Sequence, residues 1–247
     1  MENQYTALAR FYDMLNDEVA YEKWADYLEK LIKKYAKSTD IVLELACGTG
    51  TLSRILASRG YDMISVDNSP EMLNIAQEKC ADMENKPLFL CQNMCELDLY
   101  GTIDIALCCL DSVNYLTYMN DVKAMMAGVS LFMNPGGVFI FDIKTTGEFA
   151  RLKGVSNALS EDDGFYFWQY DFDKKSGLCQ HNIELFTQGE NGYERHQEVH
   201  FQRGYSFAQI EKMLEKAGFE LVGRFKELSM KKAENEEGRV FYVARKV

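Results

Sequence analysis

The residues best suited to binding chemistry in this sequence lie at the ends of two apolar runs. Glu44 lies within the run Ile41–Leu45, and Gly48 and Gly50 follow that run directly. Glycine lets backbone N–H groups approach a polar ligand closely, and a helix N-terminus favours negative charge. Asp67 ends the second run, where a carboxylate can accept both hydroxyls of a ribose as a charge-assisted pair. The pattern therefore indicates a site for a polar ligand, although Asp67 taken alone could equally be an acid in a turn at the end of a strand.

The elements that position these residues follow from the spacing of apolar side chains. The run at 41–45 is bounded by glycines, which is typical of a buried parallel strand. The segment 51–59 has helical spacing and stops at Gly60, a suitable C-cap. A second strand is expected at 63–67, followed by a helix that Ser69 and Pro70 begin. The glycines are therefore expected in a strand-to-helix turn.

The glycine spacing distinguishes between two cofactor classes. A dinucleotide fingerprint, G-x-G-x-x-G, would need glycine where Ala46 and Thr51 stand. The observed E-x-A-x-G-x-G resembles the first motif of the class I S-adenosylmethionine (SAM) methyltransferases, [D/E]-x-G-x-G-x-G. Ala46 replaces the first glycine, which is acceptable if its φ stays negative. The resemblance implies a Rossmann-like α/β fold, SAM as cofactor and methyl transfer as the activity of this chain.

The resemblance also implies which residues contact SAM. Asp67 would take the ribose, while Asn68 and Met72 would flank the adenine. Trp24 has a second interpretation, because its helical spacing also suits the packing of a leading helix in the core. The expected cofactor set is Tyr12, Trp24, Glu44, Ala46, Cys47, Gly48, Gly50, Asp67, Asn68, Met72, Asn93, Met94 and Cys109.

The third and fourth strands complete this implied site. Asn93 stands where the family commonly has aspartate, and its carbonyl oxygen can still accept from the adenine amino group. The backbone N–H of Met94 would meet a ring nitrogen. The carbonyl of Cys109, at the end of the apolar run 103–110, would hold the amino group of the cofactor. Ligands gather at the carboxyl ends of parallel strands, so all three are expected at one edge of the sheet.

The acceptor side is expected around the same edge. Tyr12 matches an x-Y-D segment that closes over the cofactor in many small-molecule methyltransferases. Asp111 and Tyr115 follow the fourth strand and would line the acceptor pocket, although they could instead cap the following turn. Residues 200–205 resemble the H-x-x-R-x-Y sequence that ends an insert in related small-molecule methyltransferases. The resemblance implies that Arg203 and Tyr205 lie on the acceptor side. The expected catalytic residues are Tyr12, Asp111, Tyr115, Arg203 and Tyr205.

His200 also belongs to that ending, but strand geometry separates it from Arg203. Side chains alternate between the two faces of a strand, so His200 shares a face with Glu198 and Gln202. A lone histidine on a polar strand face is more often solvated than catalytic. We therefore expect Arg203 and Tyr205, rather than His200, to face the acceptor.

The chain divides into a core and an insert. Residues 151–205 contain three aromatic, alternating segments joined by turns, which predict an antiparallel meander. The resemblance implies that this insert covers the active site, while residues 1–150 and 206–247 form the SAM-binding core with an N-terminal helical lid. The last two strands, at 219–228 and 239–247, have no helix between them. We therefore expect a seven-stranded, mostly parallel sheet closed by an antiparallel hairpin.

Composition limits the partners. The 247 residues carry a formal net charge of −11, which disfavours bulk nucleic acid because phosphate contacts need clustered Lys and Arg. No apolar run approaches the roughly 20 residues that cross a membrane, and the N-terminus lacks a secretory pattern. The seven cysteines include no C-x-x-C pair, which indicates reduced thiols in a cytoplasmic protein and no metal site.

These observations favour a SAM-dependent methyltransferase that acts on a nitrogen or oxygen nucleophile of a small molecule. In-line displacement at a sulfonium needs alignment of the nucleophile and exclusion of water, and removal of a proton from the acceptor. Three alternatives remain: a nucleotide- or RNA-directed methyltransferase, a SAM-binding regulatory module without activity, and an NAD-type oxidoreductase. Charge speaks against RNA, and glycine spacing speaks against NAD.

Overall fold

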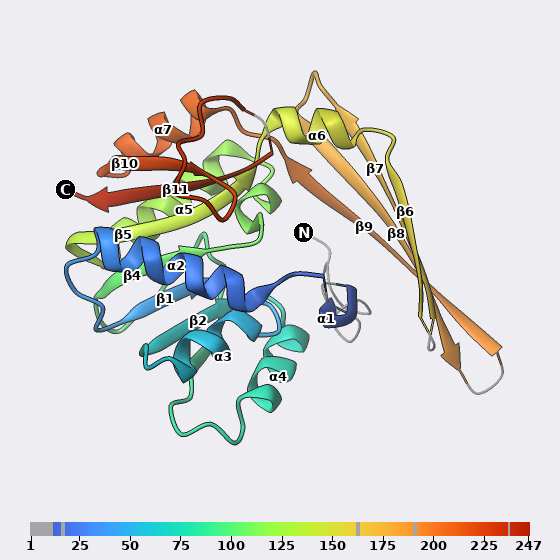
Figure 1. The fold of residues 1–247 in the computed structure, drawn as a ribbon, viewed down its shortest axis with the longest axis horizontal. Coiled ribbons are helices and arrows are strands. Elements are labelled where there is room, and N and C mark those ends of the chain that lie inside the picture. Colours follow the sequence, from blue (N-terminus) through green and yellow to red (C-terminus); the bar gives the residue numbers. More distant parts are fainter. Residues whose placement is uncertain (1–11, 16–17, 162–163, 190–191, 237) are drawn as a thin grey trace.

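The chain folds around a mixed seven-stranded sheet, shown in Figure 1. The computed structural model describes residues 12–15, 18–161, 164–189, 192–236 and 238–247. The strand order is β10-β11-β5-β4-β1-β2-β3, with the pairs on either side of β11 antiparallel and the others parallel. Its strands are β1 Val42–Leu45, β2 Met63–Asp67, β3 Leu88–Cys91, β4 Ile103–Cys108, β5 Met133–Lys144, β10 Phe219–Lys226 and β11 Arg239–Lys246. The predicted α/β class, with its closing antiparallel hairpin, is confirmed.

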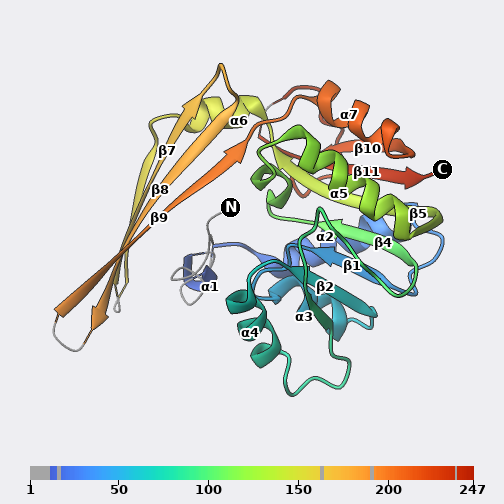
Figure 2. The same ribbon diagram turned by 180° about the vertical axis from the view of Figure 1, so that it is seen from behind.

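Helices cover both faces of this sheet (Figures 1 and 2). Helices α2 (Tyr21–Tyr35) and α3 (Thr51–Ser58) pack on one face, and α5 (Met119–Phe132) and α7 (Phe207–Lys216) pack on the other. Every residue of β1 is therefore buried, as expected for a parallel strand between two helical layers. Helix α4 (Pro70–Lys79) begins where predicted, because the Ser69 hydroxyl accepts the Met72 N–H.

A second sheet follows β5. After α6 (Thr146–Leu152), four antiparallel strands pair in sequence order: β6 Ser156–Glu161, β7 Gly164–Asp173, β8 Leu178–Gly189 and β9 Gly192–Arg203. The predicted meander has a fourth strand in addition to the three expected, because β6 pairs with β7 over six positions. The sheet projects away from the main domain beside α1 (Tyr12–Leu15) (Figures 1 and 2).

The register of the insert defines two faces. Tyr170, His181 and His200 lie directly opposite one another across β7, β8 and β9. His181 and His200 are buried. We call this side of the sheet the inner face. On β9 the alternate residues Val199 and Phe201 are exposed. The inner face is therefore the side that meets the main domain.

Among the described helices, none is long and apolar enough to cross a membrane.

Candidate active site

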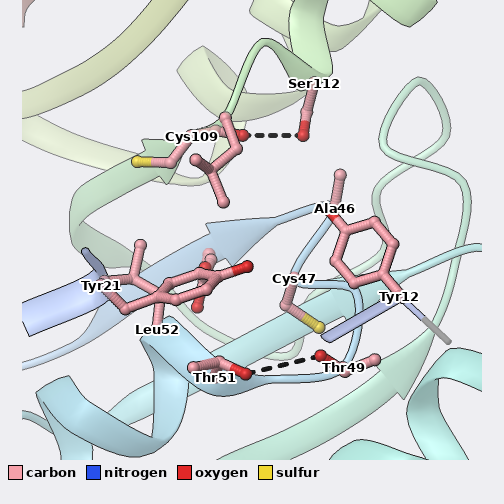
Figure 3. Close-up of a pocket in the computed structure, with 11 residues that line it drawn as sticks. Tyr12, Tyr21, Ala46, Cys47, Thr49, Thr51, Leu52, Cys109 and Ser112 are labelled. Carbon is pink, nitrogen blue, oxygen red and sulfur yellow. Dashed lines mark hydrogen bonds between the residues drawn. The ribbon is translucent and has the colours of Figure 1, made fainter. Parts of the chain in front are cut away.

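A pocket lies at the carboxyl ends of β1 and β4, shown in Figure 3. Its empty volume is about 320 Å³, part of it open to solvent. The residues that line it are Tyr12, Tyr21, Glu44, Ala46, Cys47, Thr49, Thr51, Leu52, Cys109, Leu110 and Ser112. Five of them, Tyr12, Glu44, Ala46, Cys47 and Cys109, belong to the set expected from the sequence.

The glycine turn forms the floor of the site. Gly50 has φ +69°, and a Cβ at this position would lie 2.8 Å from the Cβ of Ala76 on α4. The turn therefore requires glycine, both for its left-handed backbone and for its close approach to α4. The N–H of Gly48 donates to Oδ2 of Asp67 over 2.8 Å, and the N–H of Ser69 donates to Oδ1 over 2.9 Å. Asp67 thus links the glycine turn to the end of β2, and burial raises the pKa of its carboxyl group.

Backbone strain is concentrated beside the pocket. Ala46 has φ +51°, so the condition under which alanine would be accepted without strain is not met. Leu110 and Asp111, directly after β4, also have positive φ values of 59° and 52°. Each L-residue in this region costs on the order of 1–2 kcal/mol, and such strain is typical of functional sites. Three of the four non-glycine residues with positive φ in the described part of the chain lie at these two strand ends.

Glu44 is a buried carboxyl group in the pocket wall. Burial raises its pKa to about 7, although a hydrogen bond from the Ser53 hydroxyl opposes this shift. Ser65 on β2 donates in turn to the Ser53 oxygen over 2.8 Å. Glu44 is therefore a titratable group of the pocket near neutral pH.

Asp13 holds helix α1 against the glycine turn. Its carboxylate accepts the hydroxyl of Thr49 over 2.6 Å and forms an ion pair with Lys79 of α4. The ring of Tyr12 lies against Gly48, and burial keeps the pKa of its hydroxyl well above the ordinary value. The sequence reasoning missed Asp13 as a site residue, although the x-Y-D pattern contained it. The remainder of the expected N-terminal segment lies outside the described residues.

Tyr21 is a second pocket residue that the sequence reasoning missed. It begins α2 and lines the pocket opposite Tyr12. Burial raises the pKa of its hydroxyl, so this group stays protonated at neutral pH. The sequence feature that could have identified Tyr21 as a pocket residue was its place as the first residue of a helix at the carboxyl edge of the sheet.

Trp24 lies in the core rather than in the pocket wall. Its ring centroid is 5.1 Å from that of Phe241, and the guanidinium of Arg239 lies 5.3 Å from its ring. The packing interpretation of Trp24 therefore fits this geometry better than cofactor contact.

The residues expected to contact the adenine and the amino group of the cofactor lie at the edge of the sheet that also holds the pocket. The carbonyl of Cys109 accepts the Ser112 hydroxyl over 2.7 Å, as Figure 3 shows. The side-chain oxygen of Asn93 accepts the Cys95 N–H over 3.0 Å. The N–H of Gln92, the residue before Asn93, donates to the carbonyl of Asp67 over 3.0 Å, which places Asn93 next to the end of β2. Eight expected residues do not line the described wall of the pocket: Trp24, Gly48, Gly50, Asp67, Asn68, Met72, Asn93 and Met94.

Asp111 is held in a buried cluster of charges. Its carboxylate contacts Lys144 over 3.1 Å, Arg239 over 2.6 Å and the Gln202 side-chain amide over 2.6 Å. Burial alone would raise the pKa of Asp111, but Lys144 and Arg239 hold it well below the ordinary value. A carboxylate with such a low pKa is a poor proton acceptor at neutral pH. At neutral pH the Asp111 carboxylate therefore stays ionised, in contact with Lys144, Arg239 and Gln202.

Strand β9 presents its inner face to this cluster, contrary to the expectation for His200. His200 is 1% exposed and Gln202 is 0% exposed. The hydroxyl of Tyr115 lies 3.4 Å from Nδ1 of His200, whose Nε2 lies 2.8 Å from Oε2 of Glu198. The prediction of a solvated histidine was wrong, because the polar face of β9 packs against the end of β4 and leaves Val199 and Phe201 exposed.

The structure places Tyr205 and Arg203, both expected at the acceptor side, in different surroundings. Tyr205 is fully buried in the main core, and its hydroxyl donates to the carbonyl of Leu116. The strand ends at Arg203, and Tyr205 pairs instead with Thr145 at the start of α6. The alternation expected to place Tyr205 beside the acceptor therefore does not extend to it. Arg203 is half-buried, and its carbonyl accepts the Asn114 amide over 2.7 Å.

Comparison with known proteins agrees with this geometry. A family model described as a methyltransferase domain matches residues 42–137. A putative methyltransferase of Bacillus subtilis is 30% identical over 98% of this chain and 97% of its own length. The crystal structure of a SAM-dependent methyltransferase from Clostridium acetobutylicum is 32% identical, with a TM-score of 0.87 over 99% of both chains. A SAM-bound amino pentose methyltransferase from Micromonospora echinaspora shares the fold, with a TM-score of 0.77 at 18% identity.

The chain therefore belongs to the class I SAM-dependent methyltransferases. It is an enzyme, and its cofactor is SAM. The pocket fits this ligand, because the carboxyl group of Glu44 in its wall suits a molecule that carries positive charge.

Glu44 should make SAM affinity depend on pH. A pKa of about 7 means that folding favours the protonated carboxyl group, so its stabilising contribution is present below the ordinary pKa and is lost as pH rises through about 7. A cationic ligand favours the ionised form. SAM affinity should therefore rise by up to about tenfold per pH unit below pH 7 and level off above it, with proton release on binding. Calorimetry in buffers of different ionisation enthalpy measures both quantities.

The control for this effect is Glu44→Gln, which should flatten the pH dependence. Glu71→Gln, at an exposed position on α4, should leave it unchanged. An identical pH profile in Glu44→Gln and the wild type would show that another group titrates.

Proposed function

We propose that this enzyme methylates a nitrogen or oxygen nucleophile of a small molecule. The observation that carries the proposal is the position of the 3₁₀ turn η2 (Ser112–Tyr115). Ser112 lines the SAM pocket, and Tyr115 contacts the buried His200 of the insert. Side chains at i and i+3 of a 3₁₀ helix eclipse, with a rise of about 6 Å between them. The acceptor would lie in the short gap between these two residues, which suits a small molecule.

Charge and shape support the same proposal. The net charge of −11 leaves little basic surface for a polyanion. The inner face of the insert offers Trp168, Tyr170 and Phe172, while Phe165 and Phe167 belong to the other face by register. Aromatic groups with a few polar ones are typical of small-ligand sites. The core, residues 1–150 and 206–247, would hold SAM, and the insert, residues 151–205, would select the acceptor.

The mechanism assigns tasks to this chain's own residues. SAM supplies, when bound, a methyl group on a sulfonium centre. Asp67 would hold the ribose hydroxyls, and Glu44 would place a negative charge beside the ligand's cationic groups. Asp13 fastens α1 over the glycine turn, so Tyr12 would exclude water from that side. Alignment of the two reactants within about 3–3.5 Å then provides most of the catalysis.

Transfer of labelled methyl groups tests the proposal. The purified enzyme is incubated with methyl-labelled SAM and a cell extract separated into small molecules, RNA and protein. We expect label in the small-molecule fraction, because the proposed gap lies between Ser112 and Tyr115 of the short turn η2. Label in RNA alone, with binding that weakens steeply as salt rises, would support the RNA-directed alternative. Tight SAM binding with no transfer to any fraction would support a regulatory module.

A further inference from the structure

We propose that Tyr115, His200 and Glu198 form a proton relay that accepts the proton of the acceptor nucleophile. This inference rests on the proposed function. It names the substrate class more closely, as an acceptor whose reacting nitrogen or oxygen carries a proton, and it identifies three residues that would remove that proton.

The first support is the order of hydrogen bonds. Nε2 of His200 lies 2.8 Å from a carboxylate oxygen of Glu198, so Nε2 carries the hydrogen and donates it. Nδ1 is then the acceptor nitrogen, and the Tyr115 hydroxyl lies 3.4 Å from it. This arrangement of hydroxyl, imidazole and carboxylate has the same logic as other activated sites, where a base is oriented by a third group. Such distances often shorten when substrate binds.

The second support is location. Tyr115 ends the turn η2, which begins with the pocket residue Ser112. The inner face of β9 holds both ends of this turn, since Gln202 binds Asp111 at its N-cap and His200 binds Tyr115 at its end. The relay thus lies next to the proposed position of the reaction, and its imidazole ring is withdrawn from solvent.

The third support is a set of buried polar atoms without partners in the described part of the chain. Oε1 of Gln202, on a fully buried side chain, lacks a hydrogen bond, and so does Nε2 of His181, which lies opposite His200. Buried polar atoms of this kind need an explanation such as an absent ligand. Burial also lowers the pKa of His181 to about 3, so its ring is neutral at physiological pH. A polar acceptor that donates hydrogen bonds would satisfy these atoms.

The proposed step balances as follows. The nucleophile forms its bond to the methyl carbon while the methyl–sulfur bond breaks and leaves its electron pair on sulfur. The proton of the nucleophile passes to the Tyr115 oxygen, and the Tyr115 proton passes to Nδ1 of His200. The resulting imidazolium is stabilised by Glu198. Among the other titratable groups, His181 lies directly opposite His200 on β8, and Asp111 and Lys144 in turn act on His181.

The central test is His200→Gln, which keeps one acceptor for Tyr115 and one donor for Glu198 but cannot take up a proton. A general base contributes about 10²–10⁴-fold, so kcat should fall at least 100-fold at neutral pH. The remaining rate should continue to rise with pH where the wild-type rate has levelled off. Tyr115→Phe should cause a similar loss, and Glu198→Gln a smaller one.

The matched control is His196→Gln, on the same face of β9, where the histidine side chain is 33% exposed and contacts Thr187. Its kcat should stay within about twofold of the wild type. SAM affinity measured by calorimetry should also stay within twofold in all four variants, because none of these residues lines the SAM pocket.

The assay uses methyl-labelled SAM with the small-molecule fraction of a cell extract, so its outcomes separate the two proposals. Loss of transfer in His200→Gln with intact SAM affinity supports the relay. Wild-type kcat and pH profile in His200→Gln overturn the relay and leave the proposed function standing. If the wild-type enzyme binds SAM but labels no small molecule, the proposed function fails, and the relay fails with it.

Discussion

Replacement of Arg239 by methionine is expected to lower the free energy of unfolding by about 3–5 kcal/mol, the range for removing one partner of a buried ion pair. Arg239 on β11 contacts Asp111, Asp142 and Glu227. Asp142 is fully buried, and without Arg239 its carboxylate keeps only the Asp111 N–H among the partners seen here. Urea unfolding followed by circular dichroism measures the loss.

The pH dependence of this loss follows from Asp142. Burial raises the pKa of Asp142, and Arg239 opposes that shift. In Arg239→Met the guanidinium that lowers the pKa of Asp142 is absent, so the folded state favours the protonated carboxyl group of Asp142. The variant should then be stabilised at low pH and lose that stability as pH rises through the raised pKa. The difference from the wild type should accordingly be smaller at acidic than at alkaline pH.

The matched control is Arg195→Met on the insert. Arg195 binds Glu184 over 2.6 Å, but its side chain is 57% exposed. Exposed pairs contribute about 0–1 kcal/mol, so this variant should unfold close to the wild type. A loss of less than about 1 kcal/mol in Arg239→Met as well would contradict the interpretation of a desolvated cluster.

Replacement of Asp67 by alanine is expected to weaken SAM binding by about 1.5–3 kcal/mol, the range for hydrogen bonds to a charged group. This corresponds to roughly 10- to 150-fold in Kd. The carboxylate stands at the end of β2 and also accepts the N–H groups of Gly48 and Ser69, so its removal affects both the ribose contact and the glycine turn. Titration calorimetry with SAM measures the change.

Two further variants separate these contributions. Asp67→Asn keeps an oxygen for the Gly48 N–H but removes the charge, so its affinity should lie between those of the wild type and the alanine variant. Asp62→Ala, at the exposed opposite end of β2, should bind SAM as the wild type does. Unchanged affinity in Asp67→Ala would mean that this residue only closes a turn.

The sequence by itself determined the fold class and the cofactor edge of the sheet, because those features depend on short segments. A buried strand, a glycine turn and a helix occupy residues 42–58 without interruption, so one short stretch of sequence carries the whole pattern. Apolar spacing also predicted α2 and the closing hairpin. These are local patterns, for which hydrophobic periodicity is a strong signal.

The backbone at Ala46 shows a limit of this local reasoning. The motif predicted the turn but not its left-handed φ, which the surrounding strands impose on a residue with a Cβ. The same applies to Leu110 and Asp111, which no pattern marked as strained. Strain of this kind persists only where tertiary contacts over-determine the backbone.

Tertiary structure alone decided which side chains surround the proposed acceptor position. Alternation correctly separated His200 from Arg203, but it could not show which face of β9 would be buried, since a strand pattern fixes relative and not absolute orientation. The polar face turned inward because Gln202 and His200 find partners at the end of β4, namely Asp111 and Tyr115, 91 and 85 residues away in the chain. Burial of polar groups is favourable only where such partners exist, and contacts across that distance are set by how the two sheets pack, not by any local run of residues.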